Sequence, residues 1–343
     1  MANIFARSPY IIRIAEGGQN GSKVELFLSA TTFTGSPQYT LSKLIPASNN
    51  IETLYDISPY IREYIRFASC SAGGNAAVTN PTTERVNVRV KRYKLVTSTY
   101  TLLDTTDYIA FDGSTYYESG YNYDLGNYGL DAGNYYYNPT SDAGKIRVTT
   151  GASFTARYTN LSTAVVTSLA VASSTFDIPR VRTANVNEGN KVEILNGASA
   201  VQATWYFYPL EECKYTPVII DFVNRYGAWQ REFFFKASND TFSVENTEYN
   251  LLQTNSYNYN TLEGQRKVFN ANGKKSIKVN TGWVAETWSE VLKQIMLSER
   301  ILIDNKPAKI NTKSTELFKH INTKQINYSL DFEFTYDVIN SVI

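Results

Sequence analysis

Strict alternation of apolar and polar residues near the C-terminus is the feature that most constrains the fold. Over residues 326–338 the sequence reads INYSLDFEFTYDV, in which every second residue is aliphatic or aromatic and the others are polar. Successive side chains of a β-strand point to opposite faces, so this pattern predicts a strand with one buried and one solvent-exposed face. At about 3.3 Å per residue the run would span roughly 40 Å, so we expect it to bend or to carry a bulge.

The composition fits a multidomain protein that is rich in strands. A chain of 343 residues exceeds the size at which one hydrophobic core usually stops growing. Its 26 Tyr and 17 Phe favour strands and half-exposed interfaces. The 33 basic and 32 acidic residues give a net charge of +1, which argues against general nucleic-acid binding. The sequence contains no apolar run of about 18 residues and does not open with a signal-peptide pattern, so we expect no membrane insertion.

We predict a mainly β fold with two or three antiparallel β-sandwich-like domains and one or two short helices. Short strand patterns separated by turn signals recur along the chain, as they do in sandwiches. An N-terminal β domain would span residues 1–105, and a C-terminal β domain would span residues 205–343. Residues 106–204 would hold a Tyr/Gly-rich insertion and a Ser/Thr-rich β region.

Two breaks in the strand pattern predict helices. Ser58 is a favoured N-cap residue and Pro59 a favoured first helical residue, so we expect a short helix near residues 59–67. The sequence from Thr287 to Glu290 matches a capping box, and apolar residues follow it at helical spacing. We therefore expect a second helix near residues 288–298.

Residues 85–96 hold the one concentration of basic side chains. Val86, Val88 and Val90 alternate with polar residues, which predicts a strand with these three valines in the core. Five arginine and lysine residues occur in the same segment. They can form either a solvated sheet face or a contact with phosphate groups.

Residues 112–144 combine tyrosine with glycine, asparagine and aspartate. Antibody recognition loops have a similar composition, because rigid amphipathic rings supply contact area at low entropy cost. Three interpretations are open: an insertion that packs on its own domain, a loop ordered against a partner protein, and a platform for a glycan. The candidate partner-contact residues are Tyr116, Tyr117, Tyr121, Tyr123, Tyr128, Tyr135, Tyr136 and Tyr137.

Residues that commonly perform catalysis or bind metals are few. His320 is the only histidine, so a histidine-dependent nucleophile or metal site would rest on one imidazole. Cys70 and Cys213 lie far apart in the sequence, and two cysteines do not make a zinc site. We therefore predict a protein that is not an enzyme, with no catalytic residues, no cofactor and no metal. A catalytic pair of carboxylates needs only two acidic residues and stays open as an alternative.

Four segments carry a resemblance to a known class of protein. They are YDISPYIREYI at residues 55–65, DFVNRYGAWQREFFF at 221–235, VNTGWVAETWSEVLKQIMLSERILI at 279–303 and INYSLDFEFTYDVIN at 326–340. Together they resemble virion structural proteins of tailed DNA bacteriophages, including crAss-like and related phages of Bacteroidetes.

The resemblance implies a β-rich structural subunit of a phage virion. Such a subunit would assemble through large protein–protein interfaces into an oligomeric ring or a tail, neck or baseplate assembly. Its partners would be copies of itself and other virion proteins, and it would be made in the host bacterial cytoplasm before it enters the virion. The alternative is a receptor- or glycan-binding adhesion module that uses the Tyr/Gly-rich loop.

Overall fold

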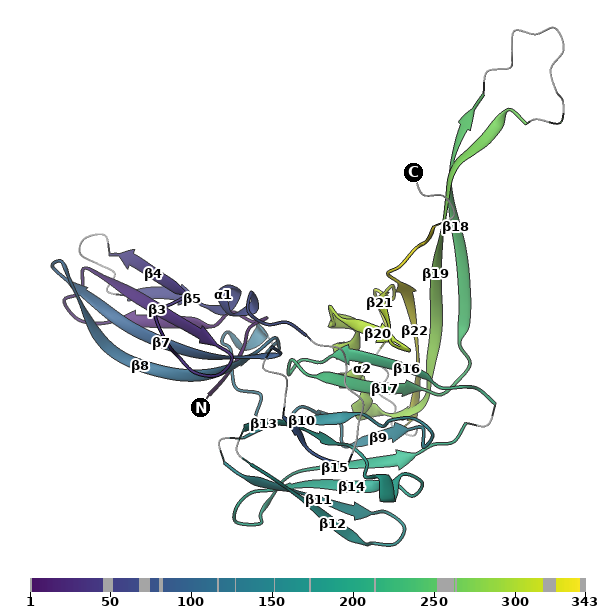
Figure 1. The fold of residues 1–343 in the computed structure, drawn as a ribbon, viewed down its shortest axis with the longest axis horizontal. Coiled ribbons are helices and arrows are strands. Elements are labelled where there is room, and N and C mark those ends of the chain that lie inside the picture. Colours follow the sequence, from purple (N-terminus) through teal and green to yellow (C-terminus); the bar gives the residue numbers. More distant parts are fainter. Residues whose placement is uncertain are drawn as a thin grey trace. The chain divides into compact units, whose positions relative to one another are not determined.

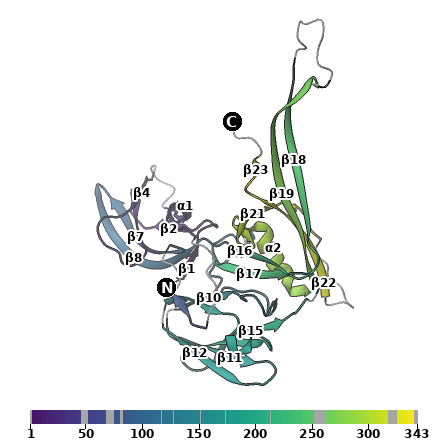
Figure 2. The same cartoon turned by 45° about the vertical axis from the view of Figure 1, so that its right-hand side comes forward.

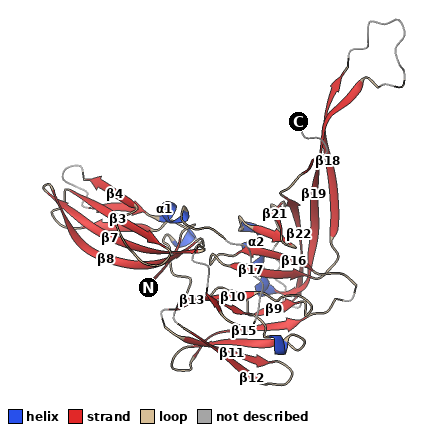
Figure 3. Ribbon diagram, in the orientation of Figure 1, coloured by secondary structure: helices blue, strands red, loops and turns tan. Residues whose placement is uncertain are grey.

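The computed structural model is mainly β, as predicted (Figures 1 and 3). It describes residues 2–45, 52–67, 75–79, 83–115, 117–126, 128–150, 152–172, 174–212, 214–251, 262, 264–316 and 325–339. The chain divides into two compact units. Unit 1 comprises residues 1–210 and 223–231, and unit 2 comprises residues 211–222 and 232–343.

The first sheet of unit 1 has five strands in the order β1-β8-β7-β3-β4. These strands are β1 (Ala2–Phe5), β8 (Thr99–Phe111), β7 (Arg85–Val96), β3 (Gly21–Ser29) and β4 (Tyr39–Leu44). Only the β1–β8 pair is parallel. Val86, Val88 and Val90 are buried in the core that β7 shares with β3, which confirms the alternation predicted for residues 85–96.

A two-stranded sheet and a short helix pack against the same core. β2 (Ile11–Ala15) pairs antiparallel with β5 (Glu52–Asp56), and α1 (Ser58–Arg62) follows directly. Ile12, Ile14 and Ile61 all belong to this buried cluster. Alternation along β2 thus places one face in the core and leaves Ile11, Arg13 and Ala15 exposed.

The remainder of unit 1 contains two further sheets. One has the order β12-β11-β14-β15-β9, and the other has the order β10-β13-β6. Their strands are β6 (Val78–Thr79), β9 (Asn134–Tyr137), β10 (Lys145–Thr150), β11 (Phe154–Asn160), β12 (Val166–Val171), β13 (Ser174–Pro179), β14 (Asn190–Leu195) and β15 (Val201–Pro209). Two 3-10 turns, η1 (Tyr117–Ser119) and η2 (Thr183–Asn185), lie in the connections.

The C-terminal sheet has the order β17-β16-β20-β21-β22-β19-β18, and β23 pairs with β19 outside this path. Its strands are β16 (Val218–Val223), β17 (Trp229–Phe234), β18 (Asn239–Asn250), β19 (Arg266–Ala285), β20 (Ile301–Ile303), β21 (Lys306–Ile310), β22 (Gln325–Phe334) and β23 (Val338–Ile339). The 3-10 turn η3 (Glu286–Trp288) leads into α2 (Ser289–Leu297). The Trp288 ring stacks on Tyr328 of β22 at 6.2 Å, which anchors the start of the helix on the sheet.

Both predicted helices exist, but their bounds differ from those expected. α1 ends at Arg62, and its N-cap is Ile57 because Asp56 Oδ1 already accepts hydrogen bonds from the Ser58 amide and hydroxyl. In α2 the N-cap residue is Trp288, and no side chain caps the helix. The capping-box prediction is therefore wrong, because Thr287 lies inside the 3-10 turn that precedes the helix.

The two domain boundaries expected from composition both fall inside strands. Residue 105 lies within β8, and residue 204 lies within β15. The composition changes near residue 112, but β8 keeps pairing with β7 up to Phe111. The Tyr/Gly-rich segment then supplies β9 to the sheet that contains β15. Within the described ranges, no helix has the length and apolar character needed to cross a membrane.

Candidate interaction surface

The candidate tyrosines occupy different environments. Tyr116 and the side chain of Tyr117 lie outside the described residues. Tyr121 is 69% exposed and makes an edge contact with the partly exposed Tyr123, with ring centroids 6.0 Å apart. Tyr128 forms an isolated bridge with Val148 and packs its ring edge on Trp205. The segment therefore leaves only some of its rings accessible to a partner.

Tyr135 and Tyr137 are core residues, each 1% exposed. β9 pairs parallel with β15, and this register stacks Tyr135 on Phe207 with centroids 5.5 Å apart. The Tyr137 hydroxyl donates a hydrogen bond of 2.7 Å to the Val186 carbonyl, and burial raises the pKa of Tyr137. Neither ring can contact a partner while the sheet is intact. Tyr136, on the other face of β9, is half-buried and tilts against Tyr208.

A recess of about 360 Å³ lies beside Tyr121 in unit 1. Its lining carries no charged side chain and comprises Ser8, Pro9, Tyr10, Ile11, Thr115, Gly120, Tyr121 and Asn122. Asn122 holds the recess together by donating hydrogen bonds to the carbonyls of Phe5 and Ser8. An uncharged lining with aromatic rings suits a neutral group better than an ion.

Two of the five basic side chains of β7, Arg89 and Arg92, pair with carboxylates of the neighbouring strand β8. Arg89 makes two hydrogen bonds to Asp107, at 2.7 and 2.8 Å, and Arg92 forms an equivalent pair with Asp104. These hydrogen bonds hold the pKa values of Asp107 and Asp104 below the usual range of a carboxyl group. The arrangement favours the solvated sheet face over the phosphate contact for Arg89 and Arg92, since both guanidinium groups already have an anionic partner.

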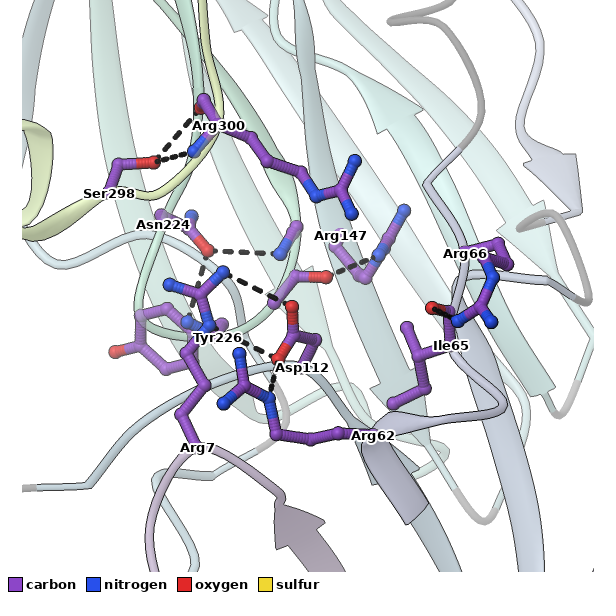
Figure 4. Close-up of polar contacts among 12 residues, drawn as sticks. Arg7, Arg62, Ile65, Arg66, Asp112, Arg147, Asn224, Tyr226, Ser298 and Arg300 are labelled. Atoms are coloured by element: carbon purple, nitrogen blue, oxygen red, sulfur yellow. Dashed lines mark hydrogen bonds and ion pairs between the residues drawn. The ribbon is translucent and has the colours of Figure 1, made fainter. Parts of the chain in front are cut away.

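Two ion networks, which the sequence alone did not suggest, stabilise unit 1, and Figure 4 shows Arg147 of the first and the arginines around Asp112 of the second. Arg147 is 5% exposed and donates hydrogen bonds to Glu84 at 2.6 Å, to Asp177 at 3.0 Å and to the Gly227 carbonyl at 2.9 Å. Burial lowers the pKa of Arg147, but the charges of Asp177 and Glu84 outweigh it and hold the pKa above its ordinary value.

The second network joins the start of the chain to the end of β8. Arg7 donates two hydrogen bonds of 3.1 Å to the Asp112 carboxylate, and Arg62 pairs with the same group at 3.2 Å. Figure 4 shows both guanidinium groups converging on Asp112. A carboxylate fully engaged by two arginines is suited to a structural role.

The described residues contain no group of three or more His, Cys, Asp and Glu side chains that could hold a metal ion. Cys70, Cys213 and His320, which the sequence analysis considered for such chemistry, lie outside those residues.

β18 and β19 form a long ribbon, which Figures 1 and 2 show from two directions. The strands pair from Asn239 opposite Lys278 to Asn250 opposite Arg266, with one bulge at Thr247 and Glu248. All twelve residues of β18 are exposed. β22 accompanies β19 only along residues 276–285, and β23 contacts it only at residues 272–273. In the described part of the chain, the outer edge of β18 has no neighbouring strand.

The two faces of the ribbon differ in polarity. Directly opposite residues of an antiparallel pair point to the same face. On one face Val244 lies opposite Gly273, and Gly273 lies opposite Val338 of β23. We call this surface the apolar face after its apolar residues, which are Phe242, Val244, Val268, Ala271, Gly273 and Val338. Lys275, Asn246 and Glu248 lie on the same face, opposite Phe242, Ala271 and Val268. The opposite face is mostly polar and carries the Lys274–Glu245 ion pair of 2.7 Å, and towards its far end Tyr249 makes an edge contact with the exposed Phe269.

The apolar face continues the core-facing side of β22. Leu330 and Phe332 are completely buried, Phe334 is half-buried, and Val338 is 54% exposed. β22 stops at Phe334 and β23 resumes at Val338, so the long strand predicted over residues 326–338 is interrupted after nine of its thirteen residues. Apolar and polar residues thus continue to alternate as far as Val338, although Val338 is no longer buried.

The chain has no match among protein-family models, curated proteins or solved structures.

The ribbon has two physical properties of an interaction surface, which are exposed apolar side chains and an unpaired strand edge in the described part of the chain. Phe242 and Val244 are 58% and 52% exposed, and they lie beside each other on a flat β surface. Contiguous exposed apolar side chains mark interaction surfaces, and an unpaired strand edge is a template for further pairing. Exposed apolar side chains and an unpaired strand edge therefore occur together on the ribbon.

Proposed function

We propose that this chain is a structural subunit of a phage virion, which assembles through large protein–protein interfaces into an oligomeric ring or a tail, neck or baseplate assembly. The exposed β18–β19 ribbon is the observation that carries the proposal. The resemblance of residues 279–303 and 326–340 to virion structural proteins supports the choice of a phage particle.

The physical reason is that a two-stranded ribbon is poorly stabilised by itself. An isolated pair of strands is marginally stable in water, and it gains stability when a hydrophobic face packs against another element. The ribbon exposes such a face along with the free edge of β18. A net charge of +1 also limits electrostatic repulsion between packed copies.

The proposal is tested by shortening the ribbon in a phage whose own gene for this chain is deleted. Residues 244–273 are replaced by an Asn-Gly turn, which closes a shorter hairpin of the same two strands. We expect the wild-type chain supplied in trans to restore intact particles and the shortened chain to fail. A melting temperature near that of the wild type would show that the shortened chain still folds.

Two results would overturn the proposal. One is a purified virion that lacks this chain. The other is a normal yield of infectious particles from the shortened, folded chain, because a structural subunit needs its assembly surface.

The recess beside Tyr121 favours a second candidate function, a receptor- or glycan-binding module. Its uncharged, partly aromatic lining suits a sugar, and Tyr121 stands exposed at its rim. A glycan array would detect binding by the wild-type chain that Tyr121→Ala abolishes. An array without any signal, together with normal phage adsorption by the same variant, would rule this candidate out.

A further inference from the structure

A row of three uncharged residues crosses the apolar face. Val244, Gly273 and Val338 form a row across three neighbouring strands, β18, β19 and β23. The Phe242 ring lies over Gly273, since a Cβ atom built there would be 2.2 Å from the ring. A glycine in a strand leaves a gap that an aromatic ring can cover. Here the covering ring of Phe242 is itself more than half exposed.

We propose that this face binds the same face of a second copy of the chain, with the two ribbons packed face to face about a two-fold axis. The inference rests on the proposed structural function and deepens it by naming one contact. An isologous contact of this kind uses one patch twice and is the commonest way in which identical chains pair.

Charge distribution favours a second copy as the occupant. At one end of the face Asp240 pairs with Lys275 at 3.3 Å. At the other end Glu248 lies opposite Val268, two residue pairs away from Arg266, so this end also carries one acid and one base. Both acids are on β18 and both bases are on β19. When the two-fold axis runs parallel to the strands, β18 of one copy lies over β19 of the other, and each charge faces an opposite one. A partner with a single sign of charge would be repelled by half of them.

The size of the face indicates how strong the contact is. Eight residue steps of about 3.3 Å along the two strands of the ribbon, spaced about 4.8 Å apart, give roughly 250 Å² per copy, and the two-residue strand β23 adds a little more. Stable interfaces bury about 800 Å² per partner, so one such contact is weak alone. A weak contact suits an assembly in which each subunit is held by several neighbours, because linked contacts reinforce one another.

Cross-linking of the full chain tests the geometry. In a background with Cys70 and Cys213 changed to serine, Val244→Cys places a thiol on the apolar face. Ser243→Cys is the matched control, because it is the adjacent exposed residue of the same strand and points to the polar face. We expect a short bis-maleimide to link two Val244→Cys chains about tenfold more efficiently than two Ser243→Cys chains, as facing sheets bring like residues together.

Sedimentation at rising protein concentration provides a second readout. Val244→Glu should weaken self-association at least about tenfold, since it places two like charges in the contact, whereas Ser243→Glu should leave it unchanged. Equal cross-linking at the two positions, or equal sedimentation of the two glutamate variants, would overturn the face-to-face contact. The proposed function would survive that result if the ribbon-shortened chain still failed to support particles, because the ribbon would then bind a different virion protein.

Discussion

The aromatic ring of Phe242 covers the backbone of Gly273 on the exposed ribbon. A Cβ atom at residue 273 would lie 2.2 Å from Cζ and 2.6 Å from Cε2 of that ring, well inside contact distance. The two residues belong to neighbouring strands, and the Phe242–Lys275 pair lies two residue pairs along the ribbon from the Val244–Gly273 pair. The Phe242 ring can approach the backbone of β19 this closely only because residue 273 has no side chain.

Gly273→Ala should therefore move the Phe242 ring without unfolding the chain. The ring is more than half exposed, so it can rotate away at little cost, and alanine in a strand is favoured over glycine by about 0.5–1 kcal/mol. We expect an unchanged or slightly higher melting temperature and self-association weakened about tenfold, or about 1.4 kcal/mol. Calorimetry and sedimentation measure the two effects separately. Unaltered self-association would mean that the position of Phe242 does not matter to the contact.

Arg147→Met should destabilise unit 1 strongly. It removes a buried guanidinium that donates to Glu84, to Asp177 and to the Gly227 carbonyl. Breaking a buried ion pair by removing one partner costs about 3–5 kcal/mol. Urea unfolding followed by tryptophan fluorescence measures the loss.

Arg89→Met is the matched control for this buried network. The Arg89–Asp107 pair has good geometry but is about one-third exposed, so solvent screens it and its loss should cost much less than the loss of the Arg147 contacts. A comparable loss in the two variants would contradict the structural role assigned to Arg147.

Stability should fall in acid partly through the two carboxylates of β8. Hydrogen bonds from Arg89 and Arg92 lower the pKa values of Asp107 and Asp104 below the ordinary value of 3.8. A depressed folded-state pKa adds stability above the unfolded pKa, and this stability is lost as the pH falls through the lower folded-state value. Melting temperatures between pH 6 and pH 2.5 should fall less steeply for an Asp104→Asn, Asp107→Asn double variant. Parallel pH profiles would contradict the assignment.

The tyrosines of the Tyr/Gly-rich segment should separate into two classes. Tyr135→Ala removes a buried ring stacked on Phe207 and should cost about 3–5 kcal/mol, as other aromatic truncations in cores do. Tyr121→Ala alters an exposed ring and should change stability by less than about 0.5 kcal/mol. Chemical denaturation of both variants gives the comparison. If Tyr121 contacts a partner, only its variant will lose that contact while it remains folded.

Local pattern predicted much of the secondary structure. Alternation placed β7 at residues 85–96 and put Val86, Val88 and Val90 in the core, because strand geometry alone decides which side chains share a face. Sequence reasoning also found both helices, but it misplaced their ends. The end of a helix depends on hydrogen bonds such as those that Ser58 donates to Asp56. The neighbouring turn decides which side chain accepts them, and a local sequence pattern does not show this.

The candidate site depended much more on tertiary structure. Eight tyrosines of similar local sequence were candidates for partner contact, yet pairing with β15 buried Tyr135 and Tyr137 and left Tyr121 exposed. The ribbon was missed because β18 carries little alternating hydrophobicity, and because its length follows from pairing with a distant strand.

The sequence by itself determined that residues 326–338 present one apolar side, since the period of two is a property of the extended chain. Only the tertiary structure decided where that side is covered. α2 and its turn pack Trp288 on Tyr328 at one end, whereas Val338 emerges on a ribbon at the other. Burial depends on which distant segments pack on the strand and exclude water. An alternating pattern shows which side of a strand is apolar, but it does not show which segment will cover that side.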